Sequence, residues 1–273
     1  MSTIGVSHRA RIFYKDWGEG PSIIFSHDWP LTADAWDPQL ISLASRGFRC
    51  IAYDRRSHGR SSQTWRGNDV DPFADDLAQI IGKLRLKDVT LVGHGVGGGE
   101  IARFIRRHGS AHVSKIVMIG AVPPLMLRSP NNPNGIPIEV FDQLRSGLLA
   151  DRSQLFRRFA HKFYGASRPG AKVSRGLKDA FWAQAMMGGH KGLYDCIQEF
   201  AEADFTTDLT QINVPTLILH GDDDQVVPIQ ASAMAASKLV TGAELKIYLG
   251  SPHGVCTTQK ERVNADLINF IRN

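Results

Sequence analysis

Residues 89–100 read Val-Thr-Leu-Val-Gly-His-Gly-Val-Gly-Gly-Gly-Glu, an apolar run followed at once by a glycine-rich turn. The apolar run predicts a β-strand over residues 89–92, and the pattern after the turn predicts a helix over residues 100–108. A strand that passes into a helix through glycines is typical of the turns on which α/β proteins bind phosphates or hold a nucleophile. The turn therefore indicates an α/β protein with a functional site at this point.

The rest of the chain repeats the alternation of short apolar runs and longer helical patterns. Such runs predict strands that are buried on both faces, and the alternation predicts a mostly parallel, doubly wound sheet covered by helices. Asp71 is the expected N-cap of one helix, with Pro72 at its first position. The other predicted strands are residues 22–25, 50–53, 115–119, 216–219 and 244–249, and the other predicted helices are 33–46, 72–86, 230–239 and 260–271.

The alternation stops between residues 123 and 205. This stretch predicts only helices, over residues 137–150, 153–163, 177–187 and 193–200. We expect a helical cap over one end of the sheet, with residues 1–122 and 206–273 forming the core. A separate second domain is the alternative, but the strand pattern resumes at Val214, which favours the cap.

Composition excludes several classes of protein. The 273 residues carry a net charge of +5 without a long basic run, which argues against a nucleic-acid-binding protein. Three cysteines without a C-x-x-C pair argue against a disulfide framework and a structural zinc site. Neither a secretory signal nor a membrane-length apolar stretch is visible, so we expect a cytoplasmic protein.

The glycine-rich turn fits two motifs. Gly93, Gly95 and Gly98 satisfy the dinucleotide fingerprint G-x-G-x-x-G. Two strands precede the turn, however, and residues 113–122 lack the acidic residue that this motif needs about 20 residues later. The nucleophile elbow G-x-S-x-G is the second fit, with Gly93 and Gly97 as its outer glycines. Its central serine is replaced by Gly95.

An acid and a histidine follow in the order that an elbow enzyme requires. Asp224 comes directly after the predicted strand 216–219, and His253 directly after the predicted strand 244–249. Both therefore lie at carboxyl ends of strands, where open α/β sheets place their chemistry. A calcium loop at Asp222–Asp224 is excluded, because Val226 and Val227 stand where a ligand and a glycine are needed. The sequence predicts a triad site with Asp224 and His253 as its acid and base.

The elbow chemistry also needs two backbone donors for an oxyanion. The first is the N–H of Val96, directly after the elbow centre. The second is expected from the loop after an early strand, where the Trp29 N–H is the natural donor and Pro30 has none.

At this point the chain resembles the α/β-hydrolase group of arylesterases and cofactor-free (non-heme) haloperoxidases, also called perhydrolases, with some lactamases nearby. The resemblance covers essentially the whole chain. Residues 27–30 resemble the group's H-G-W-P loop, and residues 53–61 resemble its D-R-R-G-H-G-R-S stretch. Further matching motifs lie at residues 11–18, 120–126, 168–174, 220–228 and 252–254.

The resemblance implies a serine carboxylesterase or perhydrolase with a Ser-His-Asp triad and no metal, heme, nucleotide or other cofactor. This chain departs from the group at three positions: Gly95 replaces the nucleophilic serine, and Asp28 and Ser57 replace glycines. Without a serine Oγ no acyl-enzyme can form at position 95, so we expect an inactive or strongly impaired enzyme. Asp28 also brings a negative charge to a site meant for an oxyanion.

Several interpretations of Gly95 stay open. The residue is either an engineered substitution or a natural divergence, and a water activated by His253 is a weaker third possibility. The alternative function is a non-catalytic protein that binds a small ligand on the same scaffold.

We expect the substrate to be a small ester or carboxylic acid, with neither nucleic acid nor membrane as partner. We expect Gly95→Ser to form peracids from a short carboxylic acid and peroxide, while hydrolysis of p-nitrophenyl acetate by this variant stays open. The sequence leaves the natural substrate and the oligomeric state open, a homo-oligomer being possible. The candidate pocket residues are Asp28, Pro30, His94, Phe141, Phe159, Phe163, Trp182, Met186 and Met187.

Overall fold

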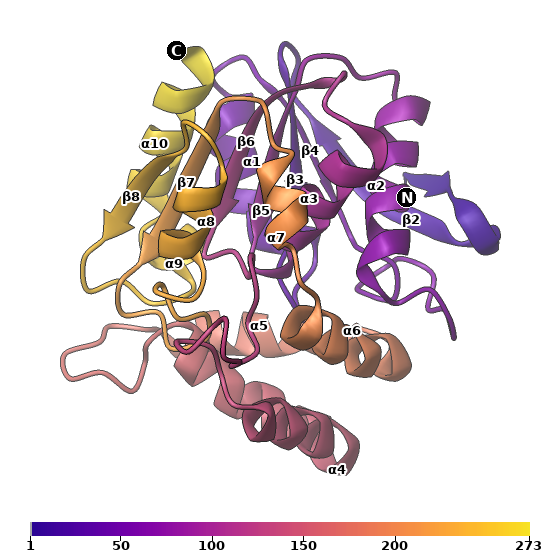
Figure 1. Cartoon of the computed structure of the whole chain (residues 1–273). Coiled ribbons are helices and arrows are strands. Elements are labelled where there is room, and N and C mark those ends of the chain that lie inside the picture. Colours follow the sequence, from indigo (N-terminus) through magenta and orange to yellow (C-terminus); the bar gives the residue numbers. More distant parts are fainter. Residues whose placement is uncertain (1) are drawn as a thin grey trace.

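A mixed β-sheet forms the centre of the computed structural model, which describes residues 2–273 (Figure 1). The strand order is β1-β2-β4-β3-β5-β6-β7-β8, with β1, β2 and β4 paired antiparallel and all later neighbours parallel. This arrangement agrees with the predicted doubly wound α/β architecture. The strands are β1 (Thr3–Gly5), β2 (Arg11–Trp17), β3 (Ser22–Ser26), β4 (Arg49–Tyr53), β5 (Val89–His94), β6 (Val113–Ile119), β7 (Thr216–Gly221) and β8 (Glu244–Tyr248).

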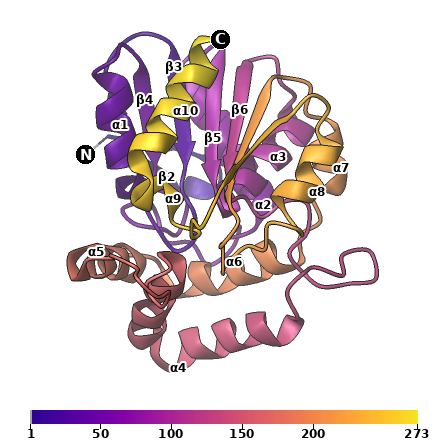
Figure 2. The ribbon, with the colours of Figure 1, turned by 90° about the vertical axis from the view of Figure 1, so that its left-hand side faces the viewer.

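Helices cover both faces of the sheet (Figure 2). Alternate residues of one strand enter different cores: Ile24 and Leu91 pack on one face, whereas Phe25 and Val92 pack on the other. Because both faces are buried, the strands read as continuous apolar runs. One face carries α1 (Asp37–Ala44) and α10 (Lys260–Arg272), and the other carries α2 (Val70–Lys83), α3 (Val96–His108), α7 (Thr206–Thr210) and α8 (Ala233–Leu239).

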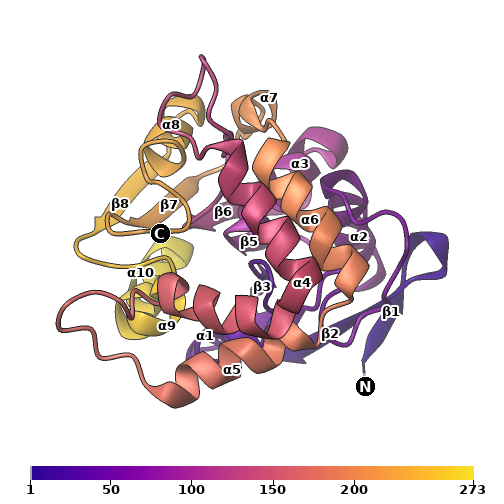
Figure 3. The same cartoon turned by 90° about the horizontal axis from the view of Figure 1, so that it is seen from below.

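Three further helices lie beyond the carboxyl ends of the parallel strands (Figures 1 and 3). They are α4 (Ile138–Phe163), α5 (Arg175–Met186) and α6 (His190–Glu202). Asp151 interrupts α4 with φ −159° and ψ 89°, at the gap predicted between two separate helices. These helices occupy the place expected of the cap, while the core and cap boundaries stay predictions.

Several helix boundaries differ from the prediction. The predicted helix 33–46 divides into a 3-10 turn, η2 (Ala33–Trp36), and α1, because Pro38 sets a new helix start. Helix α2 begins at Val70 rather than at Pro72, so Asp71 lies in the first turn and is not the N-cap. Helix α3 begins at Val96, directly after the glycine turn, although glycines are poor helix formers. The short elements η1 (Ser7–Arg9) and α9 (Val255–Thr258) had no sequence signal.

The topology brings four loops to one edge of the sheet. The loops after β3, β5, β7 and β8 all leave carboxyl ends of parallel strands, beneath the cap. These loops carry the predicted site residues, so chain segments far apart in sequence meet there. Within residues 2–273, none of the helices has the length and apolar character needed to cross a membrane.

Candidate active site

Gly95 forms the sharp turn between β5 and α3. Its backbone has φ 53° and ψ −115°, a region that side chains with a β-carbon rarely adopt. The Gly95 N–H donates to the carbonyl of Ile119 at 3.1 Å, and its carbonyl accepts from Gly98 and Val122 at 3.1 Å. This is the geometry of an elbow that presents position 95 above the edge of the sheet.

The outer glycines of the elbow are required by close packing. A β-carbon on Gly93 would lie 2.6 Å from the backbone of Gly97, and one on Gly97 would lie 2.4 Å from the carbonyl oxygen of Ser26. The structure thus gives the physical reason for the spacing that the sequence showed.

The Asp28 carboxylate fills the place where a side chain at position 95 would begin. An added β-carbon on Gly95 would lie 1.9 Å from Asp28 Oδ1 and 2.1 Å from its Cγ. Asp28 Oδ1 accepts a hydrogen bond from the Val96 N–H at 2.8 Å, which is the donor predicted for the oxyanion. Asp28 Oδ2 lies 2.9 Å from His253 Nε2. The carboxylate therefore contacts both groups that a serine at position 95 would need.

His253 and Asp224 come together as the sequence predicted. His253 Nδ1 lies 2.6 Å from Asp224 Oδ2, and Asp224 Oδ1 accepts from the N–H groups of Val226 and Val227 at 2.8 Å each. The backbone donors fix the carboxylate, and the carboxylate fixes the imidazole. The result is a continuous carboxylate–imidazole–carboxylate chain from Asp28 through His253 to Asp224.

The charges of Asp28, His253 and Asp224 alternate in sign along this chain of contacts. Burial opposes the charge on His253, but the carboxylates of Asp224 and Asp28 outweigh it and raise the pKa of His253 to about 10. Burial likewise opposes the charge on Asp28, yet the hydrogen bond and charge of His253 hold its pKa below the ordinary value. The pKa of Asp224 is lowered in the same way. At neutral pH an imidazolium therefore lies between two carboxylates.

His94 lies against this chain and stays neutral. Its Nε2 donates to the His253 carbonyl at 3.1 Å, and burial lowers the pKa of His94 to about 4. Asp28, His94 and His253 also place three donor atoms within 4.8 Å of one another, the donor types of small metal sites. The His94 and His253 rings are stacked with their planes 27° apart, and each Nε2 already has a hydrogen-bond partner, the His253 carbonyl for His94 and Asp28 for His253. The set is poorly arranged for a metal ion.

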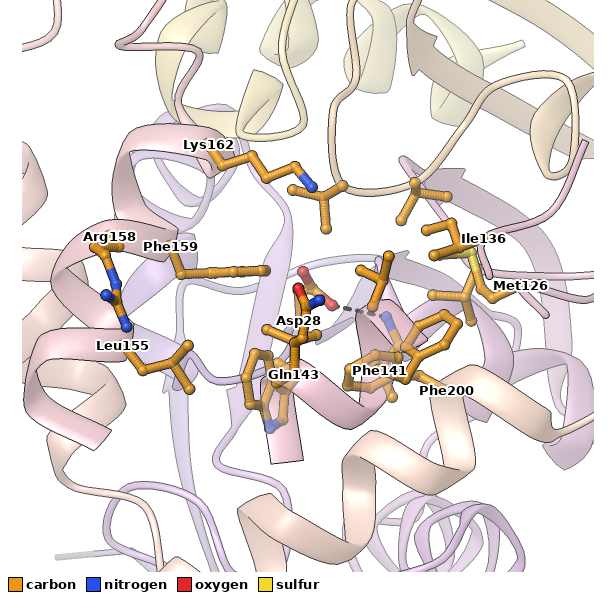
Figure 4. A pocket seen from close by; sticks show the side chains of 17 residues that line it. Asp28, Met126, Ile136, Phe141, Gln143, Leu155, Arg158, Phe159, Lys162 and Phe200 are labelled. Atoms are coloured by element: carbon orange, nitrogen blue, oxygen red, sulfur yellow. Dashed lines mark hydrogen bonds between the residues drawn. The ribbon is translucent and has the colours of Figure 1, made fainter. Parts of the chain in front are cut away.

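A cavity of about 290 Å³ opens over Asp28 (Figure 4). Asp28, Trp29 and Val96 line it from the segments that follow β3 and β5, and helix α4 supplies much of the remaining lining. The Trp29 indole N–H donates to the Leu193 carbonyl at 3.1 Å, which fixes the ring in the wall. Most of the lining is apolar, as in small-molecule sites.

The structure separates the predicted pocket residues into two sets. Asp28, Phe141 and Phe159 line the cavity, whereas the other candidates do not. The Trp182 indole N–H donates to Ser153 Oγ at 3.1 Å, and the partly buried Met186 of α5 packs against the hydrophobic core. The remaining candidates outside the cavity are Pro30, His94, Phe163 and Met187.

Other lining residues were missed by a search for aromatic and methionine side chains. Leu155, Arg158 and Lys162 share one face of α4, at helical spacing, with the predicted Phe159, and all four line the cavity. That spacing was a usable signal in the sequence. Arg158 and Lys162 bring positive charge to the lining, and burial lowers the pKa of Lys162.

Ser57, the third departure, lies outside this site. Its φ of 62° is unusual for a residue with a side chain. Ser57 Oγ donates to Asn68 Oδ1 at 2.7 Å and accepts from the Thr64 N–H at 3.0 Å. These contacts organise the loop before α2 and do not involve Asp28 or His253.

Comparisons with known proteins identify the family to which the chain is related. A family described as "alpha/beta hydrolase fold" matches residues 21–258. A non-heme haloperoxidase of Rhodococcus erythropolis is 51% identical over 100% of both chains. A bifunctional esterase/perhydrolase of Acinetobacter calcoaceticus is 49% identical over 96% of both chains. Among solved structures, a bromoperoxidase from Bacillus anthracis is 35% identical, with a TM-score of 0.96 over 100% of both chains.

Proposed function

The chain belongs to the α/β-hydrolase family, as an esterase- and haloperoxidase-type member, and from that premise we propose that it is a small-molecule hydrolase in which Asp28 replaces the nucleophilic serine. One observation carries this proposal. The Asp28 carboxylate bridges the Val96 N–H and His253 Nε2, in the space that a residue-95 side chain would fill.

Serine-type ester hydrolysis is blocked at two steps. Gly95 offers no hydroxyl for acyl transfer, and the Val96 N–H already donates to Asp28. An ester carbonyl would have to displace a carboxylate from this donor while developing negative charge beside it, which is unfavourable. The apolar cavity can nevertheless bind a small molecule, and the His253–Asp224 pair can accept and donate a proton.

This geometry changes the expectation for Gly95→Ser. The new β-carbon would collide with Asp28, so we now expect the single variant to stay inactive toward esters. Exchange of both residues, Asp28→Gly with Gly95→Ser, removes the collision and frees the Val96 donor. We expect this double variant to gain ester hydrolysis.

The test compares the unchanged chain, both single variants and the double variant on p-nitrophenyl acetate. Only the double variant should show an acyl burst, labelling by a fluorophosphonate, and turnover at least about 10³-fold above the others. Ser57→Gly is the matched control, because it reverses the departure outside the site and should leave turnover unchanged. A burst in the unchanged chain, or a folded double variant without gain, would overturn the proposal.

A non-catalytic binding protein is the second candidate, favoured by the fact that Asp28 already satisfies the oxyanion donor. It predicts binding of short carboxylic acids or esters to the chain without consumption. Calorimetric titration followed by product analysis separates the two functions.

A further inference from the structure

We propose that Asp28 is a covalent nucleophile toward saturated carbon, and that the chain hydrolyses small apolar alkyl halides. The inference rests on the proposed function, since it requires Asp28 in the place of the serine. It adds the bond that Asp28 makes and the chemical class of the substrate.

The position of the two carboxylate oxygens carries the first step. Oδ1 is held by the Val96 N–H at 2.8 Å, so the carboxylate cannot rotate freely. Asp28 lines the cavity, in which its carboxylate stands between the Phe159 and Phe141 sides of the wall (Figure 4). The carboxylate is ionised and only 4% exposed, and Oδ2 keeps a lone pair beside its contact with His253 Nε2, so it is a fixed oxygen nucleophile at the wall of an apolar cavity.

The type of electrophile follows from what Asp28 would form. Attack on an ester carbonyl would give an anhydride, which is less stable than the ester consumed, and the carbonyl oxygen would find the Val96 donor occupied. Attack on a saturated carbon gives an ordinary alkyl ester, which is stable enough to accumulate. The site therefore suits displacement at a tetrahedral carbon.

The leaving group follows from the rest of the lining. A halide departs as an anion and needs no proton, whereas an epoxide oxygen needs an acid on the far side of the carbon. Among the described lining residues, the charged groups besides Asp28 are Arg158 and Lys162, both cations on α4. Positive charge stabilises a departing halide without any proton transfer, so an alkyl halide is the simplest substrate for this lining.

In the first step an Oδ2 lone pair forms the new C–O bond, and the electron pair of the carbon–halogen bond leaves with the halide. The Asp28 ester is neutral, so His253 loses one of the two carboxylates that hold its proton. The imidazolium then releases this proton to solvent and becomes a base.

In the second step a water attacks Cγ of the Asp28 ester and gives its proton to His253 Nε2. The carbonyl electron pair moves onto Oδ1, where the Val96 N–H stabilises it. Cleavage of the Cγ–Oδ2 bond expels the alkoxide, which takes the proton from His253. The new carboxyl proton passes to His253 and restores the ion pair. The net change converts alkyl halide and water into alcohol, halide and a proton.

The test uses the full chain with n-butyl bromide in water enriched in the heavy oxygen isotope. We expect bromide and butanol to be released in equal amounts. After a single turnover the heavy isotope should be in the peptide that contains Asp28, while the butanol carries ordinary oxygen. Asp28→Asn should lower bromide release at least about 10³-fold. Asp142→Asn is the matched control, because it removes an exposed carboxylate of α4 outside the cavity and should have no effect.

A trapped intermediate gives a second measurement. His253→Gln should accumulate the butyl ester on Asp28, seen as an added butyl mass on that peptide. Should this variant fail to fold, rapid acid quenching of the unchanged chain detects the same ester.

Two results would overturn the inference: no bromide release, or butanol with heavy oxygen and no label in Asp28. Styrene oxide in the same assay tests the epoxide alternative, and turnover of this epoxide alone would overturn the halide class. The esterase exchange experiment is independent of all these outcomes, so it shows whether the proposed function fails as well.

Discussion

Gly95 and Asp28 form a matched pair of residues. A lone serine-to-glycine substitution would leave His253 Nε2 without its hydroxyl partner and the Val96 N–H free to bind an oxyanion. Here the Asp28 carboxylate contacts both groups and occupies the vacated volume. We propose that the two residues changed together, which favours natural divergence over a single engineered replacement.

Gly95→Ala tests this dependence through stability. The substitution places a β-carbon at φ 53° and 1.9 Å from Asp28 Oδ1, so it adds backbone strain and a collision. We expect the unfolding free energy to fall by roughly 2–5 kcal/mol. In Asp28→Gly the same substitution should cost only the strain, about 1–2 kcal/mol. Urea denaturation of the four proteins measures the coupling, and equal costs in both backgrounds would contradict the contact.

Single residues also show where sequence reasoning stops. Asp224 and His253 could be predicted, because each directly follows a strand and their order matches the elbow. That the Asp28 carboxylate fills the place of a residue-95 side chain could not be predicted. It depends on loops 67 residues apart meeting so closely that a β-carbon on Gly95 would lie 1.9 Å from Asp28 Oδ1. The sequence did indicate that Asp28 would disturb the oxyanion donor, and the structure gives the reason.

At the level of elements, a buried ion pair holds the β3 loop that carries Asp28. Arg55 Nε donates to Glu100 Oε2 at 2.9 Å, and Arg55 Nη2 donates to the His27 carbonyl at 2.6 Å. Arg55 follows β4 and Glu100 lies in α3, so this pair joins three elements beneath the site. It is about 1% exposed on the Arg55 side and fully buried on the Glu100 side.

Arg55→Met should therefore leave the Glu100 carboxylate buried without its cation. We expect a loss of about 3–5 kcal/mol in unfolding free energy. Arg49→Met, which breaks a partly exposed pair with Asp16, is the control and should cost less than about 1 kcal/mol. Urea denaturation measures both losses. Similar losses for the two variants would refute a special role for Arg55.

Some helices and strands can be predicted from their sequence more accurately than others. Strands β3 to β7 are mostly apolar on both faces, and their positions can be predicted from these local apolar runs. Helix α3 begins four residues before its predicted start, because tertiary packing against Ser26 and Ala121 makes glycines at 97 and 98 necessary despite their low helix propensity. The cap cavity depends on which face of α4 turns toward the sheet, and that is set by packing between distant segments.

For the whole molecule, the charge of the site makes folding stability depend on pH. In the unfolded chain His253 loses its proton near its ordinary pKa of 6.5, whereas in the native protein the pKa is raised to about 10. Between these values the native state holds the extra proton, so its stability falls as the pH rises. The lowered pKa values of Asp28 and Asp224 have the opposite effect, and their contribution is lost as the pH falls through the acid range. We expect the site to contribute most between about pH 4 and 6.5, and its contribution to decline by several kcal/mol toward pH 10.

Asp28→Asn removes one of the two carboxylates that hold the proton, so the decline between pH 6.5 and 10 should become smaller. Urea denaturation at several pH values compares the two proteins, and because all other titrating groups are shared, their difference isolates the Asp28–His253 pair. Identical slopes would mean that Asp28 does not hold the proton on His253, and the ionised chain from Asp28 to Asp224 would have to be abandoned.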